Sequence, residues 1–301
     1  PDVVSTCYYY RDAEVMAEVA EILGNGGDAT MYQNLAEEIR AGLNAEYLDE
    51  EQGHYRSRQR GGDAWLDAYR QTDNAMPLAF GMVPDEHEGA VVANLVTDVT
   101  ETRDGHLNTG CHGTKFLLPV LTEYGHQDVA YAVATATDHP SWGHWIENDM
   151  TALLEFWELD ARSRIHHFLG TVEEWFYKYL AGVQVVDPGF ERVEIAPYVP
   201  EDLDSVDARV DTVRGTVASS WERTADGLAV DVTIPGNTTA DVRIPTLGDG
   251  DVLVQEDGRT IWESGESSGA DRPGVETVER TDDRIAVTVG GGAYQFELQQ
   301  V

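Results

Sequence analysis

The hydrophobic period of this sequence changes once, near Asp187-Pro188-Gly189. Before this point, apolar residues recur roughly every three to four positions, the spacing that places side chains on one face of an α-helix. After it, apolar and polar residues alternate, as they do in strands with one buried face. The sequence therefore predicts a multi-domain protein, with a helical domain at residues 1–184 followed by a β-domain at residues 185–301.

The helical part is expected to hold about eight helices. Ser5-Thr6 is expected to cap the first and Asp28 to cap the second, which runs to Leu43. The apolar positions of the first helix are Tyr9, Val15, Met16, Val19, Ile22 and Leu23. The later helices are expected at 72–82, 85–102, 110–124, 126–137, 149–157 and 168–181. Short turns between such helices predict stacked antiparallel hairpins, whereas residues 52–70 read as a long loop.

The C-terminal part is expected to form an antiparallel β-sandwich, because short alternating runs are separated by turn residues. The expected strands are 193–195, 206–210, 216–221, 228–234, 240–244 and 285–289. Residues 256–275, rich in Gly, Ser and Asp, are expected to be a mobile excursion between strands. The domain is expected to brace the helical part.

The charge of the chain limits its partners. It carries 55 acidic and 20 basic residues, for a formal net charge of −35. Such a surface repels phosphate backbones and anionic lipids, so nucleic acid and membrane surfaces are not expected partners. Neutral ligands such as sugars are unaffected. The same excess of acid predicts a protein of a high-salt organism, either cytoplasmic or secreted.

The folded state is expected to depend on salt, because self-repulsion between acidic groups destabilises a compact chain. Molar salt shortens the screening length to about 3 Å and removes this penalty. Circular dichroism should therefore show unfolding as the salt concentration falls below roughly the molar range. Cooperative folding in low salt would contradict this prediction.

Several kinds of site are not expected. No apolar run approaches the roughly 18 residues of a membrane span, and the two cysteines, Cys7 and Cys111, lack the spacing of a zinc or redox motif. Phosphate loops, dinucleotide fingerprints and EF-hands are absent from the sequence. We therefore expect no cofactor and no catalytic metal.

Aromatic and acidic residues gather at 139–157, a combination typical of sugar sites. Trp142 and Trp145 are candidates for stacking on a sugar, with core packing as the alternative. Glu155 lies within an apolar run, so its carboxylate needs a cavity or a partner; it is our candidate general base or nucleophile. Glu147 is its rival for that role.

Two further groups are candidates for sugar contacts. Of the neighbouring His166 and His167, at most one is expected to face a pocket, and His167 is our choice. The Arg-rich residues 56–60 with Asp63 and Trp65 are expected either to pair with local acids or to line a cleft that binds an acidic or sulfated sugar.

Several stretches of the sequence resemble the α-L-rhamnosidases of glycoside hydrolase family 78. The similar stretches occur in order over residues 1 to about 240, at 7–14, 71–81, 104–110, 113–115, 140–143 and 167–182. The resemblance implies a partial (α/α)6 six-hairpin toroid followed by the β-sandwich. It also implies inverting cleavage of terminal α-L-rhamnose, in which two carboxyl groups lie about 6.5–9.5 Å apart.

The resemblance gives roles to residues of this chain. Glu155 looks like the family's general base, and Trp142 and His167 look like sugar-contacting residues. The chain departs from the family at 149–152, which leaves the sugar open, and in lacking the Arg-Asp-Glu motif that carries the general acid. A closed toroid needs twelve helices, so we expect a C-terminal fragment, with the missing N-terminal half of the barrel as partner, that does not hydrolyse rhamnosides alone.

Two alternatives remain open from the residues. One keeps the toroid but changes the chemistry, as a polysaccharide lyase or another glycosidase acting on uronic or sulfated sugars; Arg56–Arg60 could then neutralise the acid. The other is a non-catalytic sugar-binding fragment, which the absent general acid favours.

Overall fold

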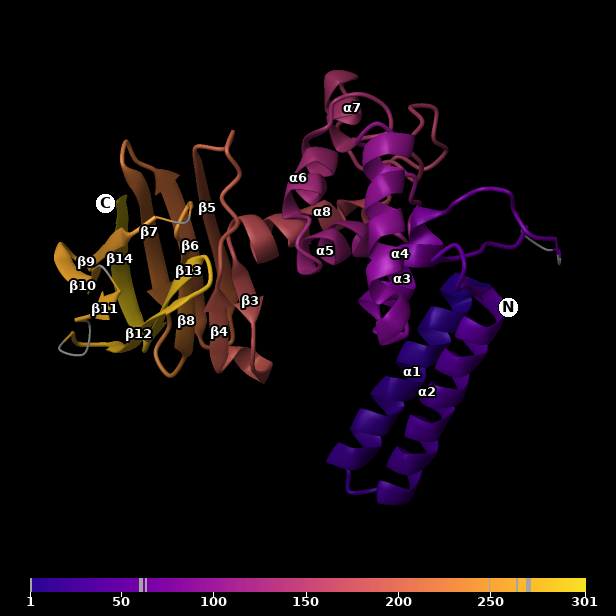
Figure 1. The fold of residues 1–301 in the computed structure, drawn as a ribbon, viewed down its shortest axis with the longest axis horizontal. Coiled ribbons are helices and arrows are strands. Elements are labelled where there is room, and N and C mark those ends of the chain that lie inside the picture. The colour runs from indigo at the N-terminus through magenta and orange to yellow at the C-terminus, as the bar shows by residue number, and fades with distance from the viewer. Residues whose placement is uncertain (1, 60–61, 63, 249, 264, 269–271) are drawn as a thin grey trace. The chain divides into compact units, whose positions relative to one another are not determined.

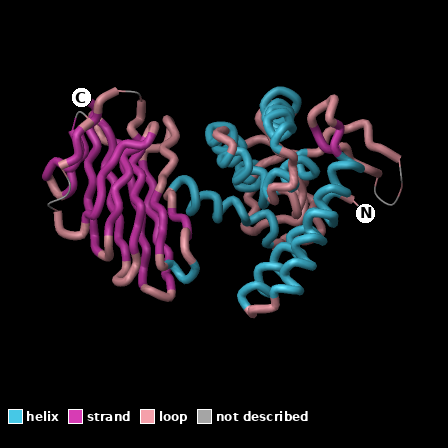
Figure 2. The backbone as a smooth tube through the Cα atoms, turned by 60° about the horizontal axis from the view of Figure 1, so that its bottom comes forward, coloured by secondary structure: helices cyan, strands magenta, loops and turns pink. Residues whose placement is uncertain are grey.

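The computed structural model describes residues 2–59, 62, 64–248, 250–263, 265–268 and 272–301. The chain packs as two units, Pro1–Val172 and Glu173–Val301. Figures 1 and 2 show that the first is helical and that strands make up most of the second. The order of the two kinds of structure agrees with the predicted fold class.

The helical unit is a series of helices joined by turns and three longer connections (Figure 1). Its elements are α1 (Val3–Ile22), α2 (Gly26–Tyr47), β1 (Leu48–Asp49), β2 (His54–Tyr55), α3 (Gln71–Ala79), α4 (Asp85–Thr97), the π-helical η1 (Asp98–Thr102), α5 (Thr114–Glu123), α6 (Gln127–Thr135), α7 (Trp142–Glu147) and the 3-10 helix η2 (His167–Thr171). α1 pairs with α2, and α5 with α6.

Some predicted helix boundaries are wrong. Asp2, rather than Ser5-Thr6, caps α1: its carboxylate accepts the N–H of Ser5 at 2.8 Å. The helix expected at 149–157 is absent, because Asp149 adopts a left-handed conformation, φ 58°, that ends α7 and starts an irregular loop. The helix in this region is α7, which begins earlier, at Trp142, and is capped by the hydroxyl of Ser141.

α1 has apolar residues on two faces. Small residues such as Ala13, Ala17 and Ala20 are buried, which is consistent with the close pairing of α1 and α2. The apolar positions singled out in the sequence are exposed instead, with Val19 42% and Ile22 84% accessible. The sequence pattern therefore identified the helix but not its buried face.

Three connections meet at one end of the helical unit. Because the helices run back and forth as hairpins, the α2–α3, α4–α5 and α6–η2 connections emerge on the same side. Direct contacts agree: the amide of Asn108 donates to the carbonyl of Tyr69, and the indole of Trp157 donates to the carbonyl of Thr109. We call this the connection end of the unit.

The second unit begins with helical residues and continues as two sheets. Its elements are α8 (Val172–Trp175), η3 (Phe176–Leu180), β3 (Val183–Val185), η4 (Pro188–Phe190), β4 (Arg192–Ile195), β5 (Ser205–Thr212), β6 (Gly215–Arg223), β7 (Gly227–Ile234), β8 (Thr239–Pro245), β9 (Val252–Glu256), β10 (Arg259–Glu263), β11 (Glu266–Ser267), β12 (Val275–Thr281), β13 (Arg284–Val289) and β14 (Gly292–Gln300). The sheet orders are β11-β10-β9-β14-β7-β6-β5 and β12-β13-β8-β4-β3.

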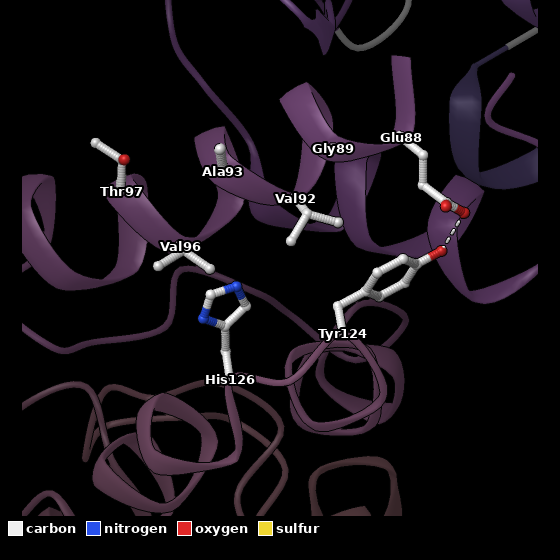
Figure 3. Close-up of a pocket in the computed structure, with 8 residues that line it drawn as sticks. All are labelled: Glu88, Gly89, Val92, Ala93, Val96, Thr97, Tyr124 and His126. Carbon is white, nitrogen blue, oxygen red and sulfur yellow. Dashed lines mark hydrogen bonds between the residues drawn. The ribbon is translucent and has the colours of Figure 1, made fainter. Parts of the chain in front are cut away.

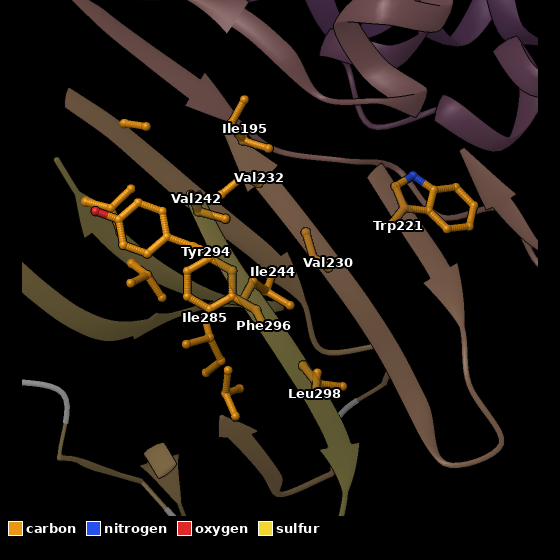
Figure 4. Close-up of a cluster of buried hydrophobic side chains, with 14 of the residues drawn as sticks. Ile195, Trp221, Val230, Val232, Val242, Ile244, Ile285, Tyr294, Phe296 and Leu298 are labelled. Atoms are coloured by element: carbon orange, nitrogen blue, oxygen red, sulfur yellow. The ribbon is translucent and has the colours of Figure 1, made fainter. Parts of the chain in front are cut away.

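The two sheets enclose one hydrophobic core (Figure 4), built from the buried alternate positions of their strands. Trp221, Val230, Ile244 and Phe296 are among its members. The indole of Trp221 donates to the carbonyl of Leu180 at 2.7 Å. The end of η3 therefore packs with the strands. The two units divide between Val172 and Glu173, upstream of the boundary expected at 184.

Two expectations for the β-domain need correction. Residues 256–275 are not only an excursion, because they contain β10 and β11; Asp257 and Gly258, both at positive φ, form the tight turn that pairs β10 with β9. The sandwich is also not wholly antiparallel: β4 and β8 run parallel, because three strands of the other sheet separate them in the chain.

Candidate functional site at the connection end

Glu155 lies on the irregular loop between α7 and η2. Two backbone hydrogen bonds close this loop: the N–H of Glu155 donates to the Ser163 carbonyl at 3.1 Å, and the N–H of His166 donates to the Leu153 carbonyl at 2.9 Å. The thiol of Cys111 also donates to the Glu155 carbonyl, with 3.6 Å between sulfur and oxygen. The main chain that carries the carboxylate is therefore held on both sides.

Cys111 comes from the α4–α5 connection and ties it to the Glu155 loop. Its sulfur also lies 3.9 Å from Nδ1 of His166. Burial, with the nearby charge of Glu155, raises the pKa of this thiol. Cys111 therefore stays protonated at neutral pH and serves as a hydrogen-bond donor rather than a nucleophile.

Three tryptophan rings pack against one another beside the Glu155 loop. Trp145 stacks on Trp157 at 4.8 Å between ring centroids, and Trp142 meets Trp157 edge-on at 5.1 Å. Each indole N–H donates to a carbonyl: Trp142 to Leu169, Trp145 to Trp157, and Trp157 to Thr109. All three rings are at most 8% exposed. In this structure they pack the loop against the helices, and sugar contacts by Trp142 or Trp145 stay predictions.

Gln71, at the start of α3, connects two of the stretches singled out in the sequence. Its side-chain oxygen accepts the N–H of Asn108 at 2.6 Å, and its own N–H donates to the Asn108 side chain at 3.2 Å. Its amide also donates to Asp98 and to the carbonyl of His106. Gln71 is fully buried, so this network fixes the α4–α5 connection beneath the Glu155 loop.

Glu147 and the two histidines at 166 and 167 lie close to Glu155 in the sequence but differ from one another in exposure. Glu155 is half-buried, whereas Glu147 is exposed at the end of α7. His167 is exposed and stacks on Phe168 with ring centroids 4.5 Å apart. His166 is half-buried and is the histidine that contacts Cys111.

Trp65 is half-buried in the α2–α3 connection. The guanidinium groups of Arg56 and Arg58 lie over its ring at 4.3 and 4.7 Å from the centroid, and Arg58 also pairs with Glu46. Part of the arginine cluster therefore does pair locally. Asp63, with Arg60, lies outside the residues that the structure describes.

Sequence reasoning missed several residues of this end. Thr109 and Cys111 hold the loop through a carbonyl and a thiol, roles that leave no signal in a pattern of residue types. Phe156, Ile165 and Phe168 are exposed apolar side chains on or beside the Glu155 loop. The apolar run around Glu155 was the sequence signal for Phe156.

His106 links two of the connections at the connection end through its imidazole ring. Its Nε2 lies 2.8 Å from a carboxylate oxygen of Asp138 and its Nδ1 lies 2.9 Å from the carbonyl of Arg103. Burial lowers the pKa of His106, but the hydrogen bonds to Asp138 and to the carbonyl outweigh it and raise the pKa overall. Both ring nitrogens donate only when the imidazole is protonated.

Protonated His106 is expected to stabilise the fold in a defined pH window. A raised folded pKa means that the stabilisation is full below the unfolded value, about 6.5, and is lost as the pH rises through the folded value. The difference in melting temperature between the native chain and His106→Gln should therefore shrink with rising pH. His126→Gln is the matched control, and a difference independent of pH would refute the assignment.

A separate cavity of about 500 Å³ lies between α4 and the α5–α6 turn. Figure 3 shows Val92 and Val96 facing His126 across it, with the hydroxyl of Tyr124 donating to Glu88. The α5–α6 turn is at the opposite end of the hairpins from Glu155, so this cavity is not part of the candidate site.

Within the described ranges, no three His, Cys, Asp or Glu side chains gather as a metal site requires. No helix in the described part of the chain is long and apolar enough to cross a membrane.

Comparison with known proteins shows what this arrangement resembles. An α-L-rhamnosidase of Streptomyces avermitilis is 31% identical over 284 residues, which cover 89% of this chain and 26% of that protein. The structure of the α-L-rhamnosidase from Dictyoglumus thermophilum superimposes with a TM-score of 0.84 at 30% identity, covering 98% of this chain and 31% of that one. The Streptomyces avermitilis α-L-rhamnosidase complexed with L-rhamnose gives a TM-score of 0.80 at 28% identity, covering 99% and 27%.

The chain thus spans only about a quarter to a third of the length of these relatives. The family described as bacterial alpha-L-rhamnosidase 6 hairpin glycosidase domain matches residues 1–180, and the corresponding C-terminal domain matches residues 182–259. Since the first match covers more than half of the chain, this protein belongs to the bacterial α-L-rhamnosidase family of six-hairpin glycosidases.

Proposed function

We propose that this chain is part of a glycoside hydrolase that removes terminal α-L-rhamnosyl residues with inversion, and that Glu155 is its general base. The observation that carries the proposal is the half-buried carboxylate on a loop fixed by Cys111 and by its own backbone. A general base must hold a water in a defined position, which requires a fixed main chain. The rhamnose complex of the Streptomyces avermitilis relative supports this choice of sugar.

The sugar contacts that we propose lie around Glu155. His167 presents an exposed imidazole at the start of η2, and Trp142 and Trp145 form the floor beneath the loop. Trp65, from the α2–α3 connection, is proposed to line the outer part of the site. Glu147 stays the rival for the catalytic role, although its exposure makes it less suited to hold a water.

The general acid is proposed to come from polypeptide outside this chain, with the missing half of the toroid as partner. The relatives are three to four times as long, and α1 carries an exposed apolar face suited to packing against further helices. The acid would stand about 6.5–9.5 Å from Glu155, as inversion requires.

The test uses hydrolysis of an aryl α-L-rhamnoside, in molar salt, by the polypeptide extended to the length of its relatives. Glu155→Gln should lower kcat by about 10²–10⁴-fold, the usual contribution of a general base. Glu147→Gln, on the exposed end of α7, is the matched control and should retain activity.

Proton NMR should show β-L-rhamnose as the first product, as inversion demands. Retained activity in Glu155→Gln with loss in Glu147→Gln would reverse the assignment. Turnover by the 301-residue chain alone would place the acid within it, and a product with a new double bond would favour a lyase.

A further inference from the structure

The main chain of Glu155 is the middle one of three neighbouring stretches at the connection end. On one side its N–H donates to the Ser163 carbonyl at 3.1 Å. On the other side its carbonyl accepts the thiol of Cys111, with 3.6 Å between sulfur and oxygen. Two positions later, the indole of Trp157 donates to the carbonyl of Thr109 at 2.8 Å. Residues 109 and 111 thus face 157 and 155, so the α4–α5 connection runs beside the Glu155 loop in the opposite direction.

The turn that carries Cys111 is itself fixed to the helices. Both the N–H and the hydroxyl of Thr114, the first residue of α5, donate to the Gly110 carbonyl, at 3.1 and 2.9 Å. Gly113 lies so close to Thr72 of α3 that an added Cβ would clash with the threonine side chain. The thiol is therefore presented to the loop from a turn that has little room to move.

Cys111 contacts both arms of the Glu155 loop. Its sulfur lies 3.9 Å from Nδ1 of His166, and the N–H of His166 donates to the Leu153 carbonyl at 2.9 Å. A thiol has one proton to donate, and its sulfur also accepts weakly. When that proton points to the Glu155 carbonyl, the sulfur can still accept from a histidine that carries a hydrogen on Nδ1. One side chain then connects the two arms to each other and to the α4–α5 connection.

We propose that Cys111 is a positioning residue for the general base, because its thiol fixes the main chain of Glu155 relative to the helices. The inference rests on the proposed function and adds to it a residue that acts without touching the sugar. A general base and its water must lie about 2.6–3.2 Å apart, and a misplacement of about 1 Å can cost up to 10²-fold in rate. The alternative is that Cys111 only fills space between the two stretches.

The kinetic test uses the polypeptide extended to the length of its relatives, with an aryl α-L-rhamnoside in molar salt. Cys111→Val fills the space of the thiol but cannot donate, so it should lower kcat by about tenfold. KM should change by less than about twofold, because the water is activated only in the transition state. Cys111→Ser keeps a donor on a shorter bond and should recover part of the lost kcat.

The second cysteine of the chain supplies the matched control. Cys7 lies on α1 and is fully buried, so Cys7→Ala leaves the Glu155 loop and its contacts in place. It should keep the native kcat even where it lowers the melting temperature by several degrees. Thermal melts of all the variants separate a loss of stability from a loss of positioning.

The pH dependence of kcat/KM separates positioning from proton transfer. The thiol donates to a main-chain carbonyl rather than to the carboxylate, so its removal should lower the whole profile without moving the acid limb that reports the base. An acid limb that moves by more than about one pH unit in Cys111→Val would show that the thiol takes part in proton transfer. That result would overturn the positioning role.

Hydrogen exchange of the 301-residue chain tests the same contact without relying on catalysis. In Cys111→Val, peptides from residues 153–166 should exchange about three- to tenfold faster, because a contact that holds the loop closed is lost. Peptides from β7 should keep their native rates. Unchanged exchange at 153–166 would overturn the proposal.

The outcomes distinguish this inference from the proposed function. Native kcat in Cys111→Val beside an inactive Glu155→Gln would overturn the positioning role and leave the base assignment standing. Full activity in Glu155→Gln would reject the base itself, whatever the exchange rates show. An equal loss of kcat in Cys111→Ser and Cys111→Val would overturn the hydrogen bond as the cause.

Discussion

Replacing Trp157 with alanine is expected to lower the free energy of unfolding of the helical unit by about 3–5 kcal/mol. The indole is 8% exposed, stacks on Trp145 and meets Trp142 edge-on. Its removal leaves a cavity between two rings and also frees the carbonyl of Thr109. Urea denaturation in molar salt, followed by the helical circular dichroism signal, measures the change.

The neighbouring Phe156 supplies the control for this prediction. Its ring is 53% exposed, so Phe156→Ala should change the free energy of unfolding by no more than about 0.5 kcal/mol. Trp157→Phe should fall between the two, because it keeps a ring but loses the hydrogen bond to Thr109. Equal effects of Trp157→Ala and Phe156→Ala would show that the tryptophan cluster does not stabilise the loop.

The spacing of apolar residues was enough to predict a helical part followed by a β-part, because the helix and strand patterns differ over many residues. Strands such as β7 and β13 alternate cleanly and were predicted, with boundaries close to those observed. β10 was missed because its turn, Asp257-Gly258, lies in a stretch rich in polar residues and glycine. The expected helix at 149–157 failed for a different reason: an apolar run satisfies both a helix and an irregular loop that packs on tryptophans.

Only part of the candidate site around Glu155 could be predicted from the sequence. Glu155 could be singled out, because an acid in an apolar run needs an explanation. The contacts that hold it could not be foreseen, since they join residues 44 or 48 positions apart through a thiol and a carbonyl. The convergence of the three connections depends on the hairpin arrangement, which periodicity implies only in outline.

α1 offers a direct test of the proposal that further helices of a toroid pack against this chain. Ala17 is 5% exposed on the buried face of α1, whereas Val19, two residues later, is 42% exposed on the other face. In this chain Ala17→Glu should cost at least about 3 kcal/mol, because it buries an unpaired charge. Val19→Glu should change the free energy of unfolding by no more than about 0.5 kcal/mol.

The same pair of variants is expected to behave differently in the polypeptide extended to the length of the relatives. If further helices of the toroid cover the second face of α1, Val19→Glu becomes a buried charge there and should destabilise about as much as Ala17→Glu, by roughly 3 kcal/mol. Thermal melts of both variants in both polypeptides measure this difference. A Val19→Glu variant that is neutral in both would show that the exposed face of α1 is not where the toroid continues, since a carboxylate cannot enter a helix interface without cost.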